Sequence, residues 1–467
     1  MLPGFEGLRG VGMTGSGLGT SLLAAVGVVG LSVAVVRCEA TPPAVEAPEA
    51  LAIGRAGRTV SLIVTDAGAG PRSLSAVLVH GQAETPVGEA VLGGGRWLPF
   101  GTPAPRTVDL SIDPKALGAK DGAATLRVTA RDHSFRRWGA GNETVLEIPV
   151  AIDFRAPVVA TDSGSIVYAR RGGTVALAYR VSEQTVRDGV ELGERFFPGV
   201  RIGVEDPAEQ RAAGWRLALF PLPIDQPGVK PVLIAEDEAG NVGRTTPRVE
   251  IEERRLPEAL LNMPPRFFQE KIPELADAVG VAESDPIAAF QEINTRIRAE
   301  NEAKIREVTS HSAPTPLWDG TFVQLANSKV TSPFAEQRTY IVDGEKISQS
   351  VHYGYDLASL AGAPVTASNA GRVVFADALG IYGQCVILDH GLDLFSLYAH
   401  LSSIEVAVGD DVAKGQVVGR SGQTGLAGGD HLHFAMLLAG HYVDPVEWWD
   451  GKWQRDRLLP KLEAARQ

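Results

Sequence analysis

The chain has 467 residues, and at about 150 residues per domain this length predicts roughly three domains. With 52 glycines, 30 prolines and 6% aromatic residues, the composition favours short strands and turns over helical bundles, so we expect a mainly β, multidomain protein. The formal net charge of −12, without a long run of Lys or Arg, argues against nucleic acid as a partner.

The first feature is an apolar segment at residues 18–36, LGTSLLAAVGVVGLSVAVV, which contains no charged residue. It is long enough to span a bilayer. A cleaved signal peptide is the alternative, but the apolar part of a signal peptide is usually nearer 7–15 residues long. The sequence therefore predicts a transmembrane anchor over 18–36, a cytoplasmic N-terminus over 1–17, and export of everything after about residue 40.

Residues 37–50 contain the stretch EATPPAVEAPEA and are expected to be a linker off the membrane. Two β-rich blocks follow, at 51–153 and 154–253. Their short alternating segments, such as ATLRVTARD in the first and PVLIAEDEAGNVG in the second, are separated by Gly, Pro, Asp and Asn, which is typical of β-sandwiches. We predict two immunoglobulin-like β-sandwiches. Neither contains a cluster of catalytic residue types, so they are expected to act as a spacer or as a scaffold for an envelope or division protein.

The apolar period changes in the next segment, residues 254–312. Pro273 and Pro286 fall where a first helical turn tolerates proline, and Asp285 is a candidate N-cap. An apolar stripe at helical spacing follows, made of Ile287, Phe290, Ile293 and Ile297. This segment is therefore predicted to be a helical connector.

Histidines gather in the block that follows. Six of the nine lie between residues 352 and 441: His352, His390, His400, His431, His433 and His441. In GGDHLHFAM, strand alternation puts His431 and His433 on one face, roughly 7 Å apart, which also fits two solvated positions on a half-exposed strand. In HYGYD, a straight strand would separate His352 and Asp356 by about 13 Å, although Gly354 permits a bend. The spacing alone is compatible with side chains that meet at a site and with polar positions on ordinary strands.

The motifs HYGYDLA, YAHL and HLHF occur in this order, with GAPVTASNAGRVVFA, VGDDVAKGQVVGRSGQTG and YVDP between or after them. This set resembles the M23 family of zinc metallopeptidases, the lysostaphin/LytM-type endopeptidases, over residues 313–450. The resemblance implies a C-terminal antiparallel-β domain of the duplicated hybrid motif type. It also implies one Zn²⁺ per chain held by His352, Asp356 and His433, with His400 and His431 as the catalytic pair.

Three protein ligands leave one position for water, whose pKa zinc lowers from 15.7 towards ~7. In SLYAHLS, alternation puts Tyr398 and His400 on one face, so that His400 can face a site. Which of His400 and His431 is the general base stays open. His390 and His441 fit no motif role and are expected to be structural. Family members often carry an acidic or amide residue where this chain has Ala435, which predicts a weaker metal site or a lower rate.

The last segment, 451–467, is expected to be a C-terminal tail. Just before it and within it, Trp448, Trp449 and Trp453 are predicted to close a hydrophobic edge rather than to stack on sugars. The two cysteines, Cys38 and Cys385, indicate neither a disulfide framework nor a cysteine metal site.

The resemblance and the apolar segment together predict a membrane-anchored zinc endopeptidase that hydrolyses peptide cross-links of bacterial peptidoglycan. It is expected as a single-pass protein of the bacterial cytoplasmic (inner) membrane with a periplasmic catalytic domain. The alternative is a catalytically silent LytM-type envelope protein that binds peptidoglycan or activates another cell-wall hydrolase. Zinc binding without hydrolysis would separate the second hypothesis from the first.

Overall fold

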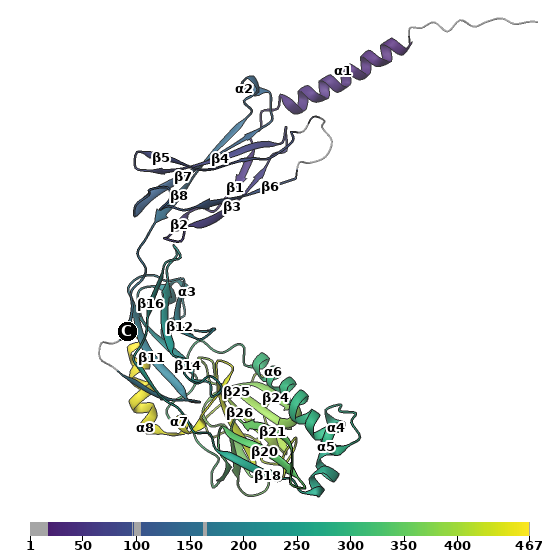
Figure 1. Cartoon of the computed structure of the whole chain (residues 1–467), viewed down its shortest axis with the longest axis vertical. Helices are drawn as coiled ribbons and strands as arrows, with labels where there is room; N and C mark the ends of the chain where they lie inside the picture. Colours follow the sequence, from purple (N-terminus) through teal and green to yellow (C-terminus); the bar gives the residue numbers. More distant parts are fainter. Residues whose placement is uncertain (1–16, 96, 98–103, 162–165, 467) are drawn as a thin grey trace, which may run out of the picture. The chain divides into compact units, whose positions relative to one another are not determined.

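The computed structural model describes residues 17–95, 97, 104–161 and 166–466, with the backbone alone for residues 17–25 (Figure 1). The chain divides into two compact units. Unit 1 comprises Met1–Ala156 with Glu238–Asn241, and unit 2 comprises Pro157–Asp237 with Val242–Gln467. Each unit has its own apolar core.

Unit 1 begins with helix α1 (Gly17–Arg37), which covers the segment predicted to be a membrane anchor. Among the residues that the structure describes, no helix is both long and apolar enough to cross a membrane. The predicted transmembrane anchor is therefore not supported. Residues 1–16 of the predicted cytoplasmic N-terminus lie outside the described residues.

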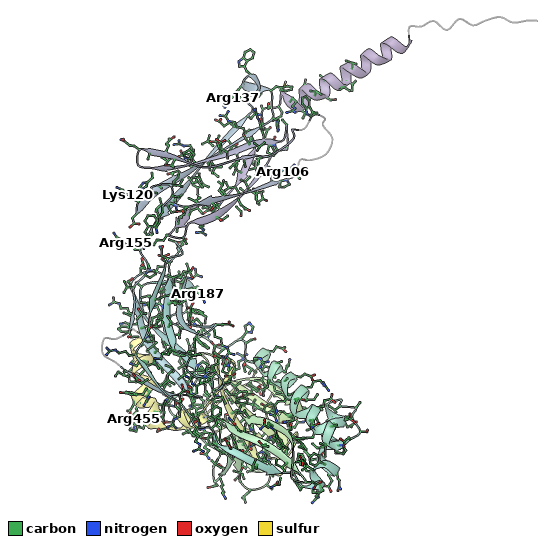
Figure 2. The ribbon with its side chains drawn as sticks, in the orientation of Figure 1. Arg106, Lys120, Arg137, Arg155, Arg187 and Arg455 are labelled. Atoms are coloured by element: carbon green, nitrogen blue, oxygen red, sulfur yellow. The ribbon has the colours of Figure 1, made fainter. Side chains whose placement is uncertain are left out.

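The rest of unit 1 is a β-sandwich, with sheets in the strand orders β1-β3-β6 and β2-β8-β7-β4-β5. Val60, Leu62 and Val64 alternate with more exposed residues along β3, and exposed side chains such as Arg106 and Lys120 project outward (Figure 2). The bounds are β1 (Ala44–Glu46), β2 (Leu51–Ile53), β3 (Arg58–Thr65), β4 (Pro71–His80), β5 (Ala83–Val91), β6 (Arg106–Ile112), β7 (Gly122–Asp132), α2 (Arg136–Gly139) and β8 (Glu143–Ile152).

Part of the predicted linker 37–50 belongs to this sandwich. Strand β1 pairs antiparallel with β3, and Val45 packs against the buried cluster between the two sheets. These backbone hydrogen bonds and the burial of Val45 order β1, although the surrounding sequence is rich in proline. The linker is therefore shorter than the sequence predicts.

Unit 2 begins with a second β-sandwich, whose larger sheets have the orders β14-β11-β9 and β13-β12-β15-β16. Val175, Leu177 and Tyr179 of β11 face the sandwich core, whereas Ala176 on the other face of β11 packs in the core of the C-terminal domain. The bounds are β9 (Val159–Thr161), β10 (Val167–Arg170), β11 (Thr174–Val181), β12 (Arg187–Leu192), β13 (Arg195–Pro198), α3 (Pro207–Arg211), β14 (Gly214–Pro221), β15 (Pro231–Glu236), β16 (Val242–Thr245) and β17 (Val249–Glu252).

The connector is helical over 267–308, as predicted, and Asp285 accepts a hydrogen bond from the Ala288 amide at the start of α5. Phe290 packs edge-to-face against Tyr340 with ring centroids 5.0 Å apart, which joins the helices to the C-terminal domain. A strand not predicted from the sequence, β18, pairs parallel with β20. The bounds are β18 (Glu258–Asn262), η1 (Phe267–Lys271), α4 (Ile272–Ala278), α5 (Pro286–Glu292), η2 (Ile293–Ile297) and α6 (Arg298–Val308).

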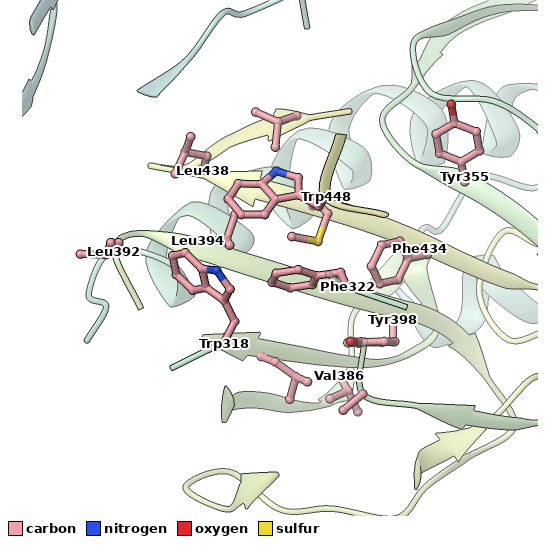
Figure 3. Close-up of a cluster of buried hydrophobic side chains, with 14 of the residues drawn as sticks. Trp318, Phe322, Tyr355, Val386, Leu392, Leu394, Tyr398, Phe434, Leu438 and Trp448 are labelled. Atoms are coloured by element: carbon pink, nitrogen blue, oxygen red, sulfur yellow. The ribbon is translucent and has the colours of Figure 1, made fainter. Parts of the chain in front are cut away.

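The C-terminal domain is built on an eight-stranded sheet, in which β19-β22-β30-β26-β25-β24-β28 are neighbours and β31 pairs with β30. Every residue of β30 is buried, because Phe434 and its alternate neighbours face the cluster of Figure 3 while Ala435 and Leu437 face the connector helices. The bounds are β19 (Lys329–Ser332), β20 (Glu336–Val342), β21 (Glu345–His352), β22 (Tyr355–Ala358), β23 (Pro364–Thr366), β24 (Gly371–Ala378), η3 (Gly380–Tyr382), β25 (Gln384–Asp389), β26 (Leu394–Leu401), β27 (Ser403–Ile404), β28 (Asp411–Val412), β29 (Val417–Arg420), β30 (Leu432–Leu438) and β31 (His441–Val443).

The predicted C-terminal tail 451–467 is helical and packed rather than extended. Leu458 and Leu462 are buried in the same core as Trp448, and the Ile202 amide of the second sandwich donates to the Ala465 carbonyl at 3.1 Å. The bounds are α7 (Pro445–Trp449), α8 (Gly451–Trp453), η4 (Gln454–Leu458) and α9 (Leu459–Ala464). This segment therefore joins the second sandwich to the C-terminal domain.

Candidate metal centre

Three side chains meet at the junction of β21, β22 and β30. His352 Nε2 lies 2.9 Å from Asp356 Oδ1 and 2.9 Å from His433 Nδ1, and the last two atoms are 3.0 Å apart. Strand pairing produces this arrangement, because β22 runs antiparallel to β30 with Asp356 directly opposite His433. All three residues are buried. The structure thus brings together the three metal ligands that the family resemblance implies.

Gly354 permits the bend between His352 and Asp356. A Cβ at this position would lie 2.6 Å from the Phe434 carbonyl oxygen and 2.7 Å from His433 Cε1. Such distances are too short for any side chain, so a larger residue would push β22 away from β30. The bend converts the distance of about 13 Å expected for a straight strand into direct contact.

The donor set fits zinc. Ligand atoms around a tetrahedral zinc with bonds of ~2.0–2.2 Å lie about 3.3–3.6 Å apart, so a small outward shift of the three groups accommodates the ion. His352 Nδ1 lies 3.0 Å from the Pro333 carbonyl oxygen, which fixes its proton there and leaves Nε2 as the ligand atom. For His433 the ligand atom is Nδ1, because it faces the other two ligand atoms at 2.9 and 3.0 Å.

The charges of the ligands also suit a metal. Burial alone would raise the pKa of Asp356, but the neighbouring charge of His352 and hydrogen bonds from three histidines outweigh it and hold this pKa well below its ordinary value. Burial lowers the pKa of His433 to about 4. At neutral pH the carboxylate is therefore charged and the His433 ring is neutral, which are the forms that bind zinc.

His400 and His431 lie beside this group. Their ring centroids are 4.9 Å apart, and His431 Nε2 is 3.6 Å from Asp356 Oδ1. Nδ1 of His400 donates to the Thr424 carbonyl and Nδ1 of His431 donates to the Gly429 carbonyl, each at 2.8 Å. Since both Nδ1 atoms are occupied, Nε2 of each ring is available for proton transfer.

The strand alternation expected for His400 is wrong. Tyr398 packs against Phe434 on the far face of the sheet and donates to no group of the site, and a regular strand would put His400 beside it. Instead His400 has a φ of +62°, a left-handed conformation that turns its side chain back towards His431 and His433. Backbone strain of this kind is common at functional sites.

The two rings differ in their electrostatics. Burial, followed by the neighbouring His431 and His433, lowers the pKa of His400 well below its ordinary value. Burial also acts against protonation of His431, but its hydrogen bond and charge interaction with Asp356 outweigh burial and raise its pKa. The site therefore holds one ring whose pKa is lowered and one whose pKa is raised.

The remaining candidates lie away from the ligands. His390 is buried between the Ala370 carbonyl and the Ser396 hydroxyl, each 2.7 Å away, and Arg195 donates to the His441 ring at 2.8 Å. Neither histidine contacts the candidate metal ligands, and their structural role stays a prediction. Ala435 is buried in an apolar cluster opposite Leu397, and the weaker metal site or lower rate expected from this position stays a prediction.

Sequence reasoning missed Arg338. Its Nη2 donates to Asp356 Oδ2 at 2.7 Å, on the side of the carboxylate away from the two histidines. The residue lies on β20, and the only sequence signal is the alternation that places Glu336 and Arg338 on one face of that strand. Nothing local shows that this face meets Asp356.

A cavity of about 990 Å³ opens onto the site. Its lining includes all five predicted site residues, together with residues of the connector between Ala259 and Glu274. Lys271 of the connector donates to the Gln423 carbonyl at 2.8 Å, which ties the helices to the loop before β30. The connector therefore forms one wall of the candidate active-site cleft.

Known proteins are similar to this chain over about a quarter of its length. The DD-carboxypeptidase/endopeptidase Mpg of Neisseria meningitidis is 36% identical over 122 residues, which cover 26% of this chain and 27% of that protein. The peptidoglycan DD-endopeptidase ShyA of Vibrio cholerae is 38% identical over 114 residues, covering 24% and 26%. The solved catalytic domain of lysostaphin from Staphylococcus simulans is 30% identical, covering 27% and 94%, with a TM-score of 0.23.

The chain spans about a quarter of the length of the curated relatives it matches. Residues 350–445 match the sequence profile of Peptidase family M23, and this range contains all five candidate site residues. The motif-based resemblance and the profile thus agree on the same strands. The C-terminal part of this chain belongs to peptidase family M23.

Proposed function

We propose that this protein is a zinc endopeptidase of the bacterial cell envelope that hydrolyses peptide cross-links of peptidoglycan. The observation that carries the proposal is the convergence of His352 Nε2, Asp356 Oδ1 and His433 Nδ1 within 3.0 Å of one another, beside two histidines with available Nε2 atoms. A complete set of metal-binding and proton-transfer groups favours hydrolysis over a purely binding role.

Zinc held by the three ligands would supply a water polarised enough to attack a peptide carbonyl at neutral pH. The neutral form of His400 suits it to accept a proton from that water. His431, whose pKa is raised, suits donation of a proton to the leaving amine or a hydrogen bond to the oxyanion. This division of roles between His400 and His431 is part of the proposal.

The substrate class rests on the relatives and on the cleft. Both curated relatives are named as endopeptidases, and one is named for peptidoglycan. The cavity of about 990 Å³ is large enough for several residues of an extended peptide. The immunoglobulin-like modules would then serve to bind an envelope or division protein, a role for which we propose no specific partner.

Digestion of purified sacculi of known cross-link type by the full-length protein tests the proposal. We expect cross-linked muropeptide dimers to disappear and monomers to appear, as measured by mass spectrometry, and a chelator should stop the reaction. A protein that contains one zinc per chain but releases no fragments from any sacculus would instead support the catalytically silent alternative.

A further inference from the structure

We propose that Arg338 is a positioning residue that restricts Asp356 to one metal-binding oxygen and so keeps a coordination position open. The inference rests on the proposed metal centre. Arg338 lies outside residues 350–445, the range that matches the family profile.

The two oxygens of Asp356 have different partners. Oδ1 lies 2.9 Å from His352 Nε2 and 3.0 Å from His433 Nδ1, whereas Oδ2 accepts from Arg338 Nη2 at 2.7 Å. The side chain of Asp356 is 12% exposed and that of Arg338 is 20% exposed, so water competes little for either group. A charge-assisted hydrogen bond of this length holds Oδ2 away from the ligand atoms.

The guanidinium of Arg338 is itself fixed in orientation. Its Nε donates to Glu336 Oε1 at 3.0 Å, and its Nη2 also donates to Ser332 Oγ at 2.7 Å. Ser332 Oγ in turn donates to Glu336 Oε1 at 2.6 Å. Because the guanidinium is planar, these contacts determine where Nη2 points. Lysine, with a single nitrogen, would not reproduce them.

The same cluster reaches a second ligand. Ser332 Oγ lies 3.2 Å from His352 Nδ1, beside the Pro333 carbonyl that receives the ring proton. Arg338 contacts Asp356 and Ser332 contacts His352, while Glu336 binds both Arg338 and Ser332; all three side chains also line the cleft. Partners of this kind orient ligands, and their loss typically lowers metal affinity by about 10–100-fold.

Without Arg338, Oδ2 would be a buried acceptor with no donor, and rotation of the carboxylate would bring it to the metal. A carboxylate that binds through both oxygens fills a position that water or substrate needs, because catalytic zinc sites depend on an open position. The expected consequence is a metal centre that is both weaker and less open.

The test compares Arg338→Met and Arg338→Lys in the full-length protein. Arg420→Met is the matched control, since Arg420 lies in the same domain, pairs with Glu405 at 3.2 Å and is 52% exposed. Zinc affinity is measured by competition with a chelator, and coordination is read from the visible spectrum of the Co²⁺-substituted protein. Four-coordinate Co²⁺ absorbs more strongly than Co²⁺ with additional ligands.

Arg338→Met should bind zinc about 10–100-fold more weakly, and its Co²⁺ bands should lose intensity, whereas Arg420→Met should match the unchanged protein. Arg338→Lys should recover part of the zinc affinity and part of the Co²⁺ band intensity. In the Arg338 variants, kcat should fall more than KM changes. Unchanged zinc affinity and an unchanged spectrum in Arg338→Met would overturn the proposal. If that variant does not fold, Glu336→Gln replaces it, with a smaller shift expected in the same direction and an unchanged spectrum counting against the proposal.

These measurements do not depend on hydrolysis. A protein that binds zinc, shows the spectral change in Arg338→Met and yet cleaves no sacculus would contradict the proposed function and leave this inference intact. Active hydrolysis with an unaffected metal centre in Arg338→Met would do the reverse.

Discussion

His431 and His433 are separated by one residue, yet they have different partners. His433 Nδ1 contacts both other ligands, whereas His431 Nε2 is 3.6 Å from Asp356 Oδ1 at the edge of the group. His433→Ala should therefore lose zinc and activity together, because only two ligands remain. His431→Ala should keep about one zinc per chain while turnover falls by about 10²–10⁴.

Zinc analysis and muropeptide release on the two purified variants check this prediction. Equal loss of zinc in both variants would make His431 a ligand. Unchanged zinc in both would mean that the metal does not bind at this strand, and the proposed site would be wrong.

Glu447 carries a pH dependence that is separate from the metal centre. Its carboxylate accepts from the Thr174 amide at 2.7 Å in the joint between the second sandwich and the C-terminal domain, and burial raises its pKa to about 8. Because the folded-state pKa lies above the unfolded value near 4.5, the stabilising contribution is complete below about pH 4.5 and is lost as pH rises through 8.

We therefore expect the thermal stability of unit 2 to fall between pH 5 and pH 8.5, by on the order of 1–3 kcal/mol. Glu447→Gln should flatten this dependence, because it removes the titrating group and keeps an acceptor for the Thr174 amide. Thermal melts of both proteins across this pH range provide the measurement. Parallel pH profiles for the two proteins would show that another group is responsible.

At the residue scale, the five candidates came from the family resemblance that the HYGYDLA, YAHL and HLHF motifs carry together, because the spacings alone left the interpretation open. Their individual roles stay predictions until the variants are measured. The turn of His400 and the contact of Arg338 could not be predicted. The first depends on a single left-handed residue that breaks alternation, and the second depends on how β20 is placed beside β22.

Among the elements, α7 shows how aromatic residues close the core. Trp448 is fully buried, with ring centroids 5.8 Å from Trp318 and 5.4 Å from Phe322 (Figure 3). Trp448→Ala should lower the free energy of unfolding by about 3–5 kcal/mol. Trp453 is only partly buried against the same cluster, so Trp453→Ala should lower the free energy of unfolding by less.

Chemical denaturation of the two variants tests this order. Glycan binding should change little in either, in line with the prediction that these rings close a hydrophobic edge. Trp453→Ala with normal stability and weakened glycan binding would instead assign a sugar-stacking role to that ring.

The elements were predicted best where the pattern is local. Alternation identified the sandwich strands, and the apolar stripe identified the connector helices. Strand β18 and the C-terminal helices were missed, because each is ordered by a partner far along the chain: β20 for β18, and the second sandwich for Ala465. The immunoglobulin-like assignment and the exact domain boundaries stay predictions.

For the whole molecule, the two β-sandwiches differ in their relation to the enzyme. Removal of residues 1–156 should leave the folding of unit 2 and its turnover of soluble muropeptides nearly unchanged, because none of the described side chains in this range belongs to the cores of unit 2. Removal of 157–253 should not be tolerated, because Ala176, Ile202 and Leu217 pack in the core of the C-terminal domain.

Expression yield, melting temperature and turnover of the two truncated proteins decide between these outcomes. The sequence suggested a spacer or a binding scaffold for both sandwiches, and the shared core adds that the second also packs against the C-terminal domain. A large rise in turnover on removal of residues 1–156 would show that unit 1 restrains the enzyme.

The shared core of the second sandwich and the C-terminal domain has a consequence for how such proteins diversify. Recombination that exchanged only the stretch matching the family profile, residues 350–445, would separate Leu217 and Leu219 from Leu438 and Val443, and would leave apolar surface on both fragments. Exchange of residues 157–467 as one block would keep these contacts. The heritable module in this chain is therefore expected to be larger than the catalytic domain, with the second sandwich inherited as part of the enzyme.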